Sequence, residues 1–143
     1  MQPIDKWMKK NVHVVRPLDS IEHARVLMQK HRINQLPVTE KGRLVGIITD
    51  RDLRDAYPSV FEEAAHDMAN EADDFRPEDI YVESVMTGTV STLGTAATLA
   101  DAARIMRQER VGAVPVVDDG GALVGLITRS DILDAYVDLD KAS

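Results

Sequence analysis

The sequence contains no cysteine and few aromatic residues, which make up only 4% of its 143 residues. The first absence excludes disulfide bonds, thiolate zinc sites and cysteine nucleophiles together. The second means that a hydrophobic core has to be built from aliphatic side chains and methionine. A chain of this length can bury roughly two-thirds of its unfolded surface, so it can fold without a disulfide or a structural metal ion.

Long apolar runs are also missing. No stretch approaches the roughly 20 apolar residues that a membrane-spanning helix needs. Residues 1–7 lack the apolar segment that is typical of a signal peptide. We therefore expect a cytoplasmic protein that has no membrane partner.

Acidic side chains outnumber basic ones by 24 to 17. The formal net charge is -7, and residues 58–81 hold 8 acidic side chains against 1 basic side chain. A nucleic-acid-binding domain usually carries a basic patch or stripe, so we expect no nucleic-acid partner. The four histidines show no spacing that is typical of a metal site, and we expect no bound metal ion.

The dominant positive feature of the sequence is an internal repeat. Residues 33–38 match 111–116, and residues 44–49 match 123–128 after a one-residue insertion in the intervening turn. Matches of this extent indicate two copies of one structural unit. The predicted parts of this one domain are a first repeat over 1–57, an acidic helical linker over 58–81 and a second repeat over 82–143.

Each repeat has the hydrophobic pattern of a β-α-β-β-α unit. In the first repeat the predicted elements are a strand over 12–15, a helix capped by Ser20, strands over 36–39 and 44–48, and a helix from Thr49 to about Tyr57. Such a unit is too small to bury its own apolar surface well. The predicted fold is therefore α/β (α+β), with the two repeats packed through their sheets as a pseudo-twofold pair.

The linker has its own helical pattern. Apolar residues recur at helical spacing over 60–72, which predicts a connecting helix. The apolar face of this helix either covers the domain to which it belongs or contacts a second subunit or partner. The sequence leaves both possibilities open.

A short motif recurs where the last strand of each repeat gives way to its last helix. A glycine and two apolar residues are followed by Thr49 and Asp52 in the first repeat, and by Thr128 and Asp131 in the second. A threonine hydroxyl can hydrogen-bond a phosphate, and an aspartate three residues later can accept from two ribose hydroxyls. The motif is therefore our candidate for a nucleotide-binding site.

Arginine and glycine complete the motif. Arg51 and Arg129 stand between the threonine and the aspartate, where a guanidinium can neutralise a phosphate. Gly46 and Gly125 allow either a ligand or another backbone segment to approach closely.

The same spacing is also that of a helix capping box. In a capping box, a serine or threonine and the residue three positions later accept hydrogen bonds from each other's backbone amides. Thr98 and Asp101 share this spacing at a place where we expect only a cap. The spacing alone therefore leaves both ligand binding and pure capping open.

Together these features resemble a pair of CBS (cystathionine β-synthase) domains, also called a Bateman module. The residues that carry the resemblance are Val-Met-Thr at 85–87, Leu-Pro-Val at 36–38, Val-Pro-Val at 114–116 and the two Gly-apolar-apolar-Thr-x-x-Asp motifs. The length and the acidic intervening segment are similar to those of stand-alone pairs of the acetoin-utilisation type.

The resemblance implies a regulatory sensor of AMP, ADP, ATP or S-adenosylmethionine that needs no cofactor and has no catalytic activity. In the family the motif aspartate holds ribose and the threonine helps to hold phosphate. Two further positions, which resemble phosphate contacts of the family, are Arg32 and Arg110. The base usually lies against apolar side chains, which here implies Val12, Val14, Ile33, Leu36, Val90, Val111 and Val114.

The resemblance also implies a homodimer and a separate regulated protein. It further implies two ligand-binding clefts between the sheets. Lys9 and Lys10 depart from the repeat, since the second copy has Thr87 and Gly88 there, so these two clefts are expected to differ in ligand or occupancy. The alternative function is an interaction or dimerisation scaffold with unoccupied clefts. We find no P-loop, nucleophile elbow or dinucleotide fingerprint, and we therefore expect no enzyme.

Overall fold

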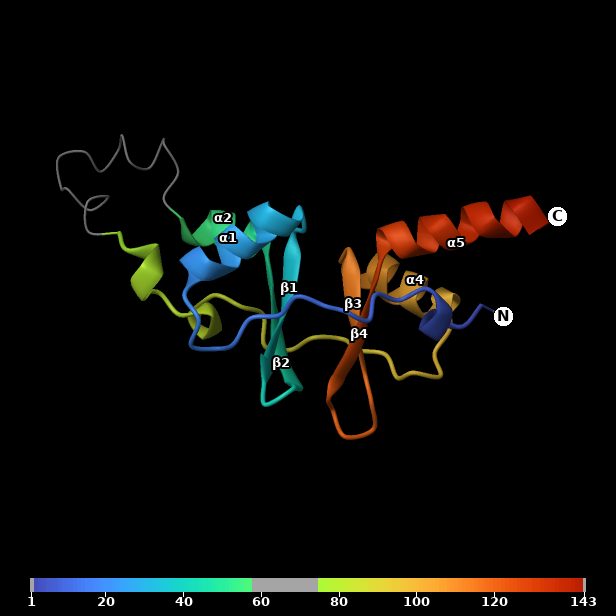
Figure 1. Cartoon of the computed structure of the whole chain (residues 1–143), viewed down its shortest axis with the longest axis horizontal. Coiled ribbons are helices and arrows are strands. Elements are labelled where there is room, and N and C mark those ends of the chain that lie inside the picture. Colours follow the sequence, from blue (N-terminus) through green and yellow to red (C-terminus); the bar gives the residue numbers. More distant parts are fainter. Residues whose placement is uncertain (1, 58–74, 143) are drawn as a thin grey trace. The chain divides into compact units, whose positions relative to one another are not determined.

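The computed structural model describes residues 2–57 and 75–142, and these residues form a mixed α/β structure (Figure 1). The described α-helices and strands form two sets, and both sets have the order helix, strand, strand, helix. The first set is α1 (Ile21–His31), β1 (Gln35–Glu40), β2 (Arg43–Thr49) and α2 (Asp50–Ala56). The second set is α4 (Leu99–Glu109), β3 (Ala113–Val117), β4 (Leu123–Thr128) and α5 (Arg129–Ala142).

The helices begin where the sequence predicts. The Ser20 hydroxyl caps α1 by accepting a hydrogen bond from the His23 backbone amide at 3.0 Å. Thr98 caps α4 in the same way. Both helices end at an arginine in the left-handed conformation, Arg32 with φ 55° and Arg110 with φ 57°. The two repeats therefore share their helix starts and stops. The starts follow the Ser and Thr cap signals, whereas arginine is not a usual residue for a left-handed helix end.

Each pair of strands forms a small antiparallel sheet. The predicted turn between β1 and β2 is confirmed, because Lys41 and Gly42 both adopt positive φ, 53° and 81°. A two-residue hairpin turn with positive φ at both positions matches the twist of the strands on either side. The predicted strands over 36–39 and 44–48 are thus confirmed as parts of β1 and β2.

The prediction of a strand over 12–15 is wrong, because only Val15 pairs with β1. Its amide donates to the Pro37 carbonyl at 3.1 Å, and its carbonyl accepts from the Thr39 amide at 2.9 Å. The next rung of this parallel ladder would need a donor at Pro37, and proline has no backbone N–H. Leu93 forms the same single bridge beside Pro115 in the second repeat.

The predicted helix over 60–72 lies outside the described residues.

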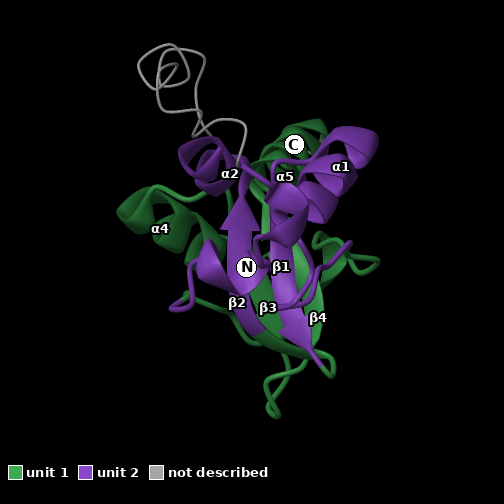
Figure 2. Ribbon diagram, turned by 90° about the vertical axis from the view of Figure 1, so that its left-hand side faces the viewer, with its two compact units in different colours: residues 1–12, 41–44, 90–143 green, residues 13–40, 45–89 purple. Residues whose placement is uncertain are grey.

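The chain folds into two compact units, each with its own core (Figure 2). Unit 1 comprises residues 1–12, 41–44 and 90–143, and unit 2 comprises residues 13–40 and 45–89. The unit 1 core consists of Ile4, Met8, Leu99, Ala102, Met106, Val114, Val116, Ile127 and Ala135. The unit 2 core consists of Val15, Ile21, Ala24, Met28, Leu36, Val38, Ile48, Leu53 and Val82.

The compact units and the sequence repeats divide the chain differently. Met8 comes from the first repeat but packs in the core of unit 1, which is otherwise built from the second repeat. Conversely, Val82 comes from the second repeat but is fully buried in the core of unit 2. Each unit therefore includes the leading segment of the other repeat.

Reciprocal backbone hydrogen bonds attach each leading segment to the edge of a strand. In unit 1, Lys9 and Leu126 exchange two N–H···O bonds of 2.9 Å each. In unit 2, Thr87 and Ile47 exchange equivalent bonds of 2.9 and 3.0 Å. These paired residues occupy matching positions of the two repeats, so both attachments have the same register.

The motif glycines make this attachment possible. A Cβ atom added at Gly46 would lie 2.8 Å from the Thr87 carbonyl oxygen and 2.7 Å from the Met86 sulfur. At Gly125 it would lie 3.0 Å from the Lys9 oxygen and 2.5 Å from the Met8 sulfur. Of the two approaches that the sequence allows at these glycines, the structure thus shows that of another backbone segment.

We expect Gly46→Ala to destabilise the protein by about 1–3 kcal/mol, because the added methyl group has to displace a hydrogen-bonded backbone segment. Gly88→Ala is the matched control, since nothing lies within 4 Å of a Cβ atom at Gly88. Urea unfolding of both variants measures the difference. Equal stability of the two variants would show that the leading segment does not approach Gly46 as described.

Candidate functional site

The first motif lies at the junction of β2 and α2. The Asp52 amide donates to the Thr49 hydroxyl at 3.1 Å, and the Thr49 amide donates to Asp52 Oδ2 at 2.9 Å. This reciprocal arrangement is a capping box, the same as that of Thr98 and Asp101 at the start of α4. The capping interpretation of Thr49 and Asp52 is therefore confirmed.

Capping occupies only one of the two carboxylate oxygens of Asp52. Within residues 2–57 and 75–142, Asp52 Oδ1 has no hydrogen-bond or ion-pair partner, and the residue is half-buried. An ionised carboxylate has about four acceptor positions, so the cap leaves Asp52 able to accept from a ligand. The cap also fixes the orientation of the carboxylate, since it ties Oδ2 to the backbone.

The second motif has the same cap but a different environment. Asp131 Oδ2 accepts from the Thr128 amide at 2.8 Å and from the Thr128 hydroxyl at 2.9 Å. Asp131 Oδ1 accepts from the Lys9 ammonium at 2.7 Å. The same ammonium donates to the Thr128 hydroxyl at 3.2 Å. Both oxygens of this buried aspartate are thus engaged within unit 1.

Within the described residues, no hydrogen bond or ion pair joins the predicted phosphate-binding arginines to the motif threonines and aspartates. Arg32 and Arg110 cap the C-termini of α1 and α4, and both side chains are exposed. Arg51 is exposed in the first turn of α2. Arg110 and Arg129 do come together, because both line a pocket of about 460 Å³ in unit 1.

The pocket that holds Arg110 and Arg129 lies between α4 and α5. Its lining residues are Ala103, Met106, Arg107, Arg110, Arg129, Ile132 and Leu133. Within the described parts of the chain, none of its three arginines forms an ion pair. The pocket therefore combines an apolar floor with uncompensated positive charge.

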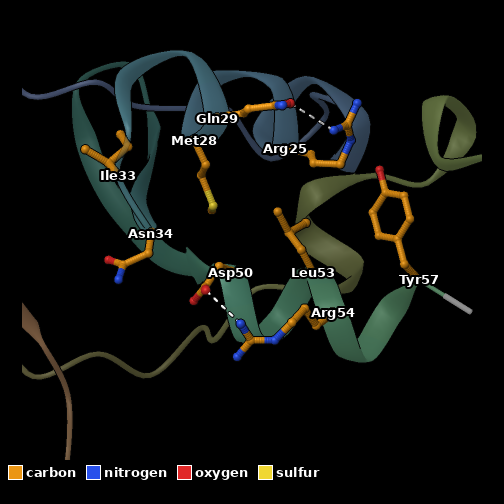
Figure 3. A pocket seen from close by; sticks show the side chains of 9 residues that line it. All are labelled: Arg25, Met28, Gln29, Ile33, Asn34, Asp50, Leu53, Arg54 and Tyr57. Atoms are coloured by element: carbon orange, nitrogen blue, oxygen red, sulfur yellow. Dashed lines mark hydrogen bonds and ion pairs between the residues drawn. The ribbon is translucent and has the colours of Figure 1, made fainter. Parts of the chain in front are cut away.

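A related pocket of about 380 Å³ lies between α1 and α2 in unit 2 (Figure 3). Met28 and Leu53 point into the space between the two helices, and Ile33 lies at its edge. Here the arginines are neutralised: Arg54 pairs with Asp50 at 2.9 Å, and Arg25 pairs with Glu22. The two pockets are thus similar in position within their repeats, but only the pocket of unit 1 carries arginines without an ion-pair partner among the described residues.

Glu22 is the centre of a small polar network beside this second pocket. It accepts hydrogen bonds from Arg25 and from the Tyr57 hydroxyl, the latter at 2.7 Å. The hydrogen bond from Arg25, followed by that from Tyr57, holds the pKa of Glu22 below its usual range. Burial, followed by the bond to Glu22, raises the pKa of Tyr57. The network keeps Arg25 engaged and leaves the pocket with little net charge.

The seven predicted base contacts divide into three groups. Leu36 and Val114 are at most 1% exposed and belong to the two cores. Val14 and Val111 lie on the surface with 37% and 36% exposure. The half-buried positions, which combine access with an apolar environment, are Val12, Ile33 and Val90.

Sequence reasoning missed a pair of histidines in unit 2. The His13 and His31 rings stack with their centroids 3.7 Å apart and an interplanar angle of 16°. The matching positions of the second repeat are Ser91 and Glu109, which are joined by a hydrogen bond from the serine hydroxyl. The repeat alignment contained a signal for this contact. It pairs His13 with Ser91 and His31 with Glu109, and each of the two pairs forms a contact within its own unit.

Residues 2–57 and 75–142 contain neither a cluster of metal ligands nor a membrane-spanning helix. No three His, Asp or Glu side chains come together there in a way that could hold a metal ion. None of the described helices combines the length and the apolar character that a bilayer-spanning helix requires.

Comparison with known proteins identifies relatives across both repeats. The CBS domain family profile matches residues 4–59 and 82–138. A CBS domain-containing protein of Dictyostelium discoideum is 33% identical over 94% of this chain and 90% of its own length. An inosine-5'-monophosphate dehydrogenase of Korarchaeum cryptofilum is 33% identical over 90% of this chain, which spans only 23% of that enzyme.

A solved structure shows the same fold. The CBS domain pair of protein MJ0100 superposes with a TM-score of 0.76 and 27% identity, covering 96% of this chain and 98% of that one. That structure is a complex with 5'-methylthioadenosine and S-adenosyl-L-methionine. The duplicated α/β architecture is therefore that of solved CBS pairs.

The histidine stack predicts a loss of stability on acidification. Desolvation, followed by the proximity of His13 and Lys30, lowers the pKa of His31 from 6.5. As the pH falls below 6.5, the unfolded chain binds a proton at His31 more readily than the folded protein does. The stability of the folded protein therefore decreases. We expect His31→Gln to reduce the stability loss between about pH 7.5 and pH 5.5.

His23→Gln is the control for this experiment, because His23 is exposed on the same helix. Urea unfolding at several pH values gives the stability profile of each variant. A profile of His31→Gln that is as steep as those of the parent and of His23→Gln would contradict the effect of the stack.

Proposed function

Because the chain belongs to the CBS domain family, we propose that it is a regulatory module that binds an adenine nucleotide or an adenosyl compound and catalyses no reaction on it. The observation that carries the proposal is the free oxygen of Asp52 on a carboxylate held in place by its capping box. The complex of the MJ0100 pair with two adenosyl compounds supports this class of ligand.

The geometry of the motif supports ribose recognition by Asp52. The two ribose hydroxyls of an adenosyl ligand are adjacent donors, and Asp52 Oδ1 is an ionised acceptor on a half-buried side chain. Hydrogen bonds to an ionised acceptor are roughly twice as strong as neutral ones. Because Oδ2 is already tied to the Thr49 amide, little side-chain entropy is lost when ribose binds to Oδ1. Asp131 is the equivalent ribose residue of the second repeat.

Phosphate binding is assigned to the arginines and the motif threonines. Thr49 and Thr128 supply hydroxyl groups at the helix starts, and Arg32 and Arg51 supply exposed guanidinium groups in the first repeat. In the second repeat, Arg110 and Arg129 share the positively charged pocket. Unpaired guanidinium groups favour phosphate-bearing ligands such as AMP, ADP or ATP over S-adenosylmethionine.

The base is assigned to the apolar positions that ligands can reach. Val12, Ile33 and Val90 are half-buried and suit this role better than the core residues Leu36 and Val114. The exposed Val14 and Val111 complete the predicted set.

The output of the module requires a partner. We propose a cytoplasmic homodimer whose assembly, or whose contact with a separate regulated protein, changes when the ligand binds. The exposed apolar residues of α5 support such an interface: Leu133, Tyr136, Val137 and Leu139 are each more than half exposed. They also support the second candidate function, a dimerisation or interaction scaffold whose clefts stay empty.

A thermal-shift panel separates the two functions. We expect AMP, ADP, ATP or S-adenosylmethionine to raise the melting temperature by several degrees, because a ligand at 100 times its Kd adds about 2.7 kcal/mol of stability. Guanine nucleotides are the comparison. If no adenosyl compound changes the melting temperature, the scaffold is the better description.

Asp52→Ala tests the residue on which the proposal rests. Removing a hydrogen bond to a charged group costs about 1.5–3 kcal/mol, so affinity for the ligand should fall roughly ten- to a hundredfold by calorimetry. The matched control is Asp101→Ala, which removes the same kind of capping box from α4. Both variants should lose about 1 kcal/mol of stability, but only Asp52→Ala should lose affinity. If Asp52→Ala binds the ligand with unchanged affinity, Asp52 serves only as part of the helix cap.

A further inference from the structure

We propose that Lys9 is a lock on the second ligand site: its ammonium occupies the oxygen of Asp131 that a ribose would use. The two sites then differ in affinity and fill in order, the Asp52 site first. This inference rests on the proposed function, because it concerns the affinity of the same motifs for adenosyl ligands. It also gives a specific cause for the difference between the clefts that the repeat alignment suggests.

Backbone pairing determines where Lys9 lies. The Lys9 amide and carbonyl both form hydrogen bonds with the backbone of Leu126. Leu126 lies on β4, two residues before Thr128. The preceding Met8 packs against Gly125 and is buried in the core of unit 1. The Lys9 side chain therefore starts from a fixed point beside the motif.

The lock connects an accessible cation to a buried anion. The Lys9 ammonium lies 2.7 Å from Asp131 Oδ1 and 3.2 Å from the Thr128 hydroxyl. The Lys9 side chain is 53% exposed, whereas that of Asp131 is 8% exposed. A buried carboxylate that lost this partner would need another donor, and two ribose hydroxyls are suitable replacements. Because Lys9 is half exposed, it can turn into solvent when a ligand replaces it.

The first motif lacks this lock because of one residue. Thr87 holds the same backbone position beside β2 that Lys9 holds beside β4. Its side chain is short and uncharged, and no hydrogen bond joins it to Asp52 within the described residues. Within the described residues, a ligand at Asp52 therefore has no ion pair to break, whereas a ligand at Asp131 first has to break a charge-assisted hydrogen bond. We expect the second site to bind roughly ten- to a hundredfold more weakly.

The repeat supplies the variants that test this inference. Lys9→Thr gives the second site the residue of the first, and Thr87→Lys gives the first site the residue of the second. Lys10→Thr is the control, because it removes a neighbouring lysine whose only described ion pair, at 3.6 Å, is with the exposed Asp5. Each protein is titrated with AMP and with S-adenosylmethionine in a calorimeter.

For the parent and for Lys10→Thr we expect one strong site and a second site at least tenfold weaker. Lys9→Thr should strengthen the weak site at least tenfold, so that the two sites become similar. Thr87→Lys should weaken the strong site by a comparable factor. Two equal sites in the parent, or a weak site that Lys9→Thr leaves unchanged, would overturn the lock while leaving the proposed function intact. Absence of binding to every protein, Lys9→Thr included, would overturn both.

A second measurement tests the lock without a ligand. Lys9→Thr and Asp131→Asn should each lower the melting temperature, and the double variant should lose less than the two losses added together, because both changes remove the same contact. Additive losses would mean that Lys9 and Asp131 are not energetically coupled, and the lock would be rejected.

Discussion

Short backbone segments from the opposite repeat approach Gly46 and Gly125 so closely that a single methyl group would collide with them. Each segment exchanges two hydrogen bonds with the strand that carries the motif. The contact brings the buried Met8 into the core of unit 1 and packs the partly buried Met86 against the core of unit 2. It also sets the residue that stands beside each motif aspartate. The composition of the compact units and the chemistry of both candidate sites depend on this contact.

One consequence is that two nearly identical motifs are chemically different. Thr49 with Asp52 and Thr128 with Asp131 form the same cap, which orients the carboxylate by one oxygen. Among the described residues, the other oxygen is free at Asp52 and engaged at Asp131, because the neighbouring segment brings Lys9 to the second motif and Thr87 to the first. Capping and ligand binding are therefore not exclusive interpretations of this spacing. Capping positions the group with which the ligand is proposed to bind.

Local features of the fold were predictable from the sequence, because they are determined by residues close together in the chain. Ser20 and Thr98 cap their helices, and Lys41 with Gly42 forms the hairpin turn. The prediction of a strand over 12–15 failed because the pairing of this segment with β1 needs backbone N–H donors on β1. Pro37 has no backbone N–H. Pairing partners that are distant in the chain are not specified by local pattern.

The site was predictable to a similar extent. The repeat alignment found the motifs and marked Lys9 as a departure, but it could not show that Lys9 reaches Asp131, 122 positions away in the chain. The alignment pairs Met8 with Met86 without showing on which strand each packs. For the same reason the stack of His13 on His31 was missed, since 18 positions separate them and neither ring belongs to a recognisable motif.

In the proposed complex, Asp52 contacts the ligand through Oδ1 while its cap stays intact through Oδ2. Carbon-13 NMR of the aspartate side-chain carboxylates, with Asp52 and Asp101 assigned by substitution, tests this directly. On addition of AMP, the Asp52 resonance should shift in proportion to occupancy, and the Asp101 resonance, from a cap without a ligand, should stay in place. Binding of AMP that leaves the Asp52 resonance unchanged would show that Asp52 does not contact the ligand.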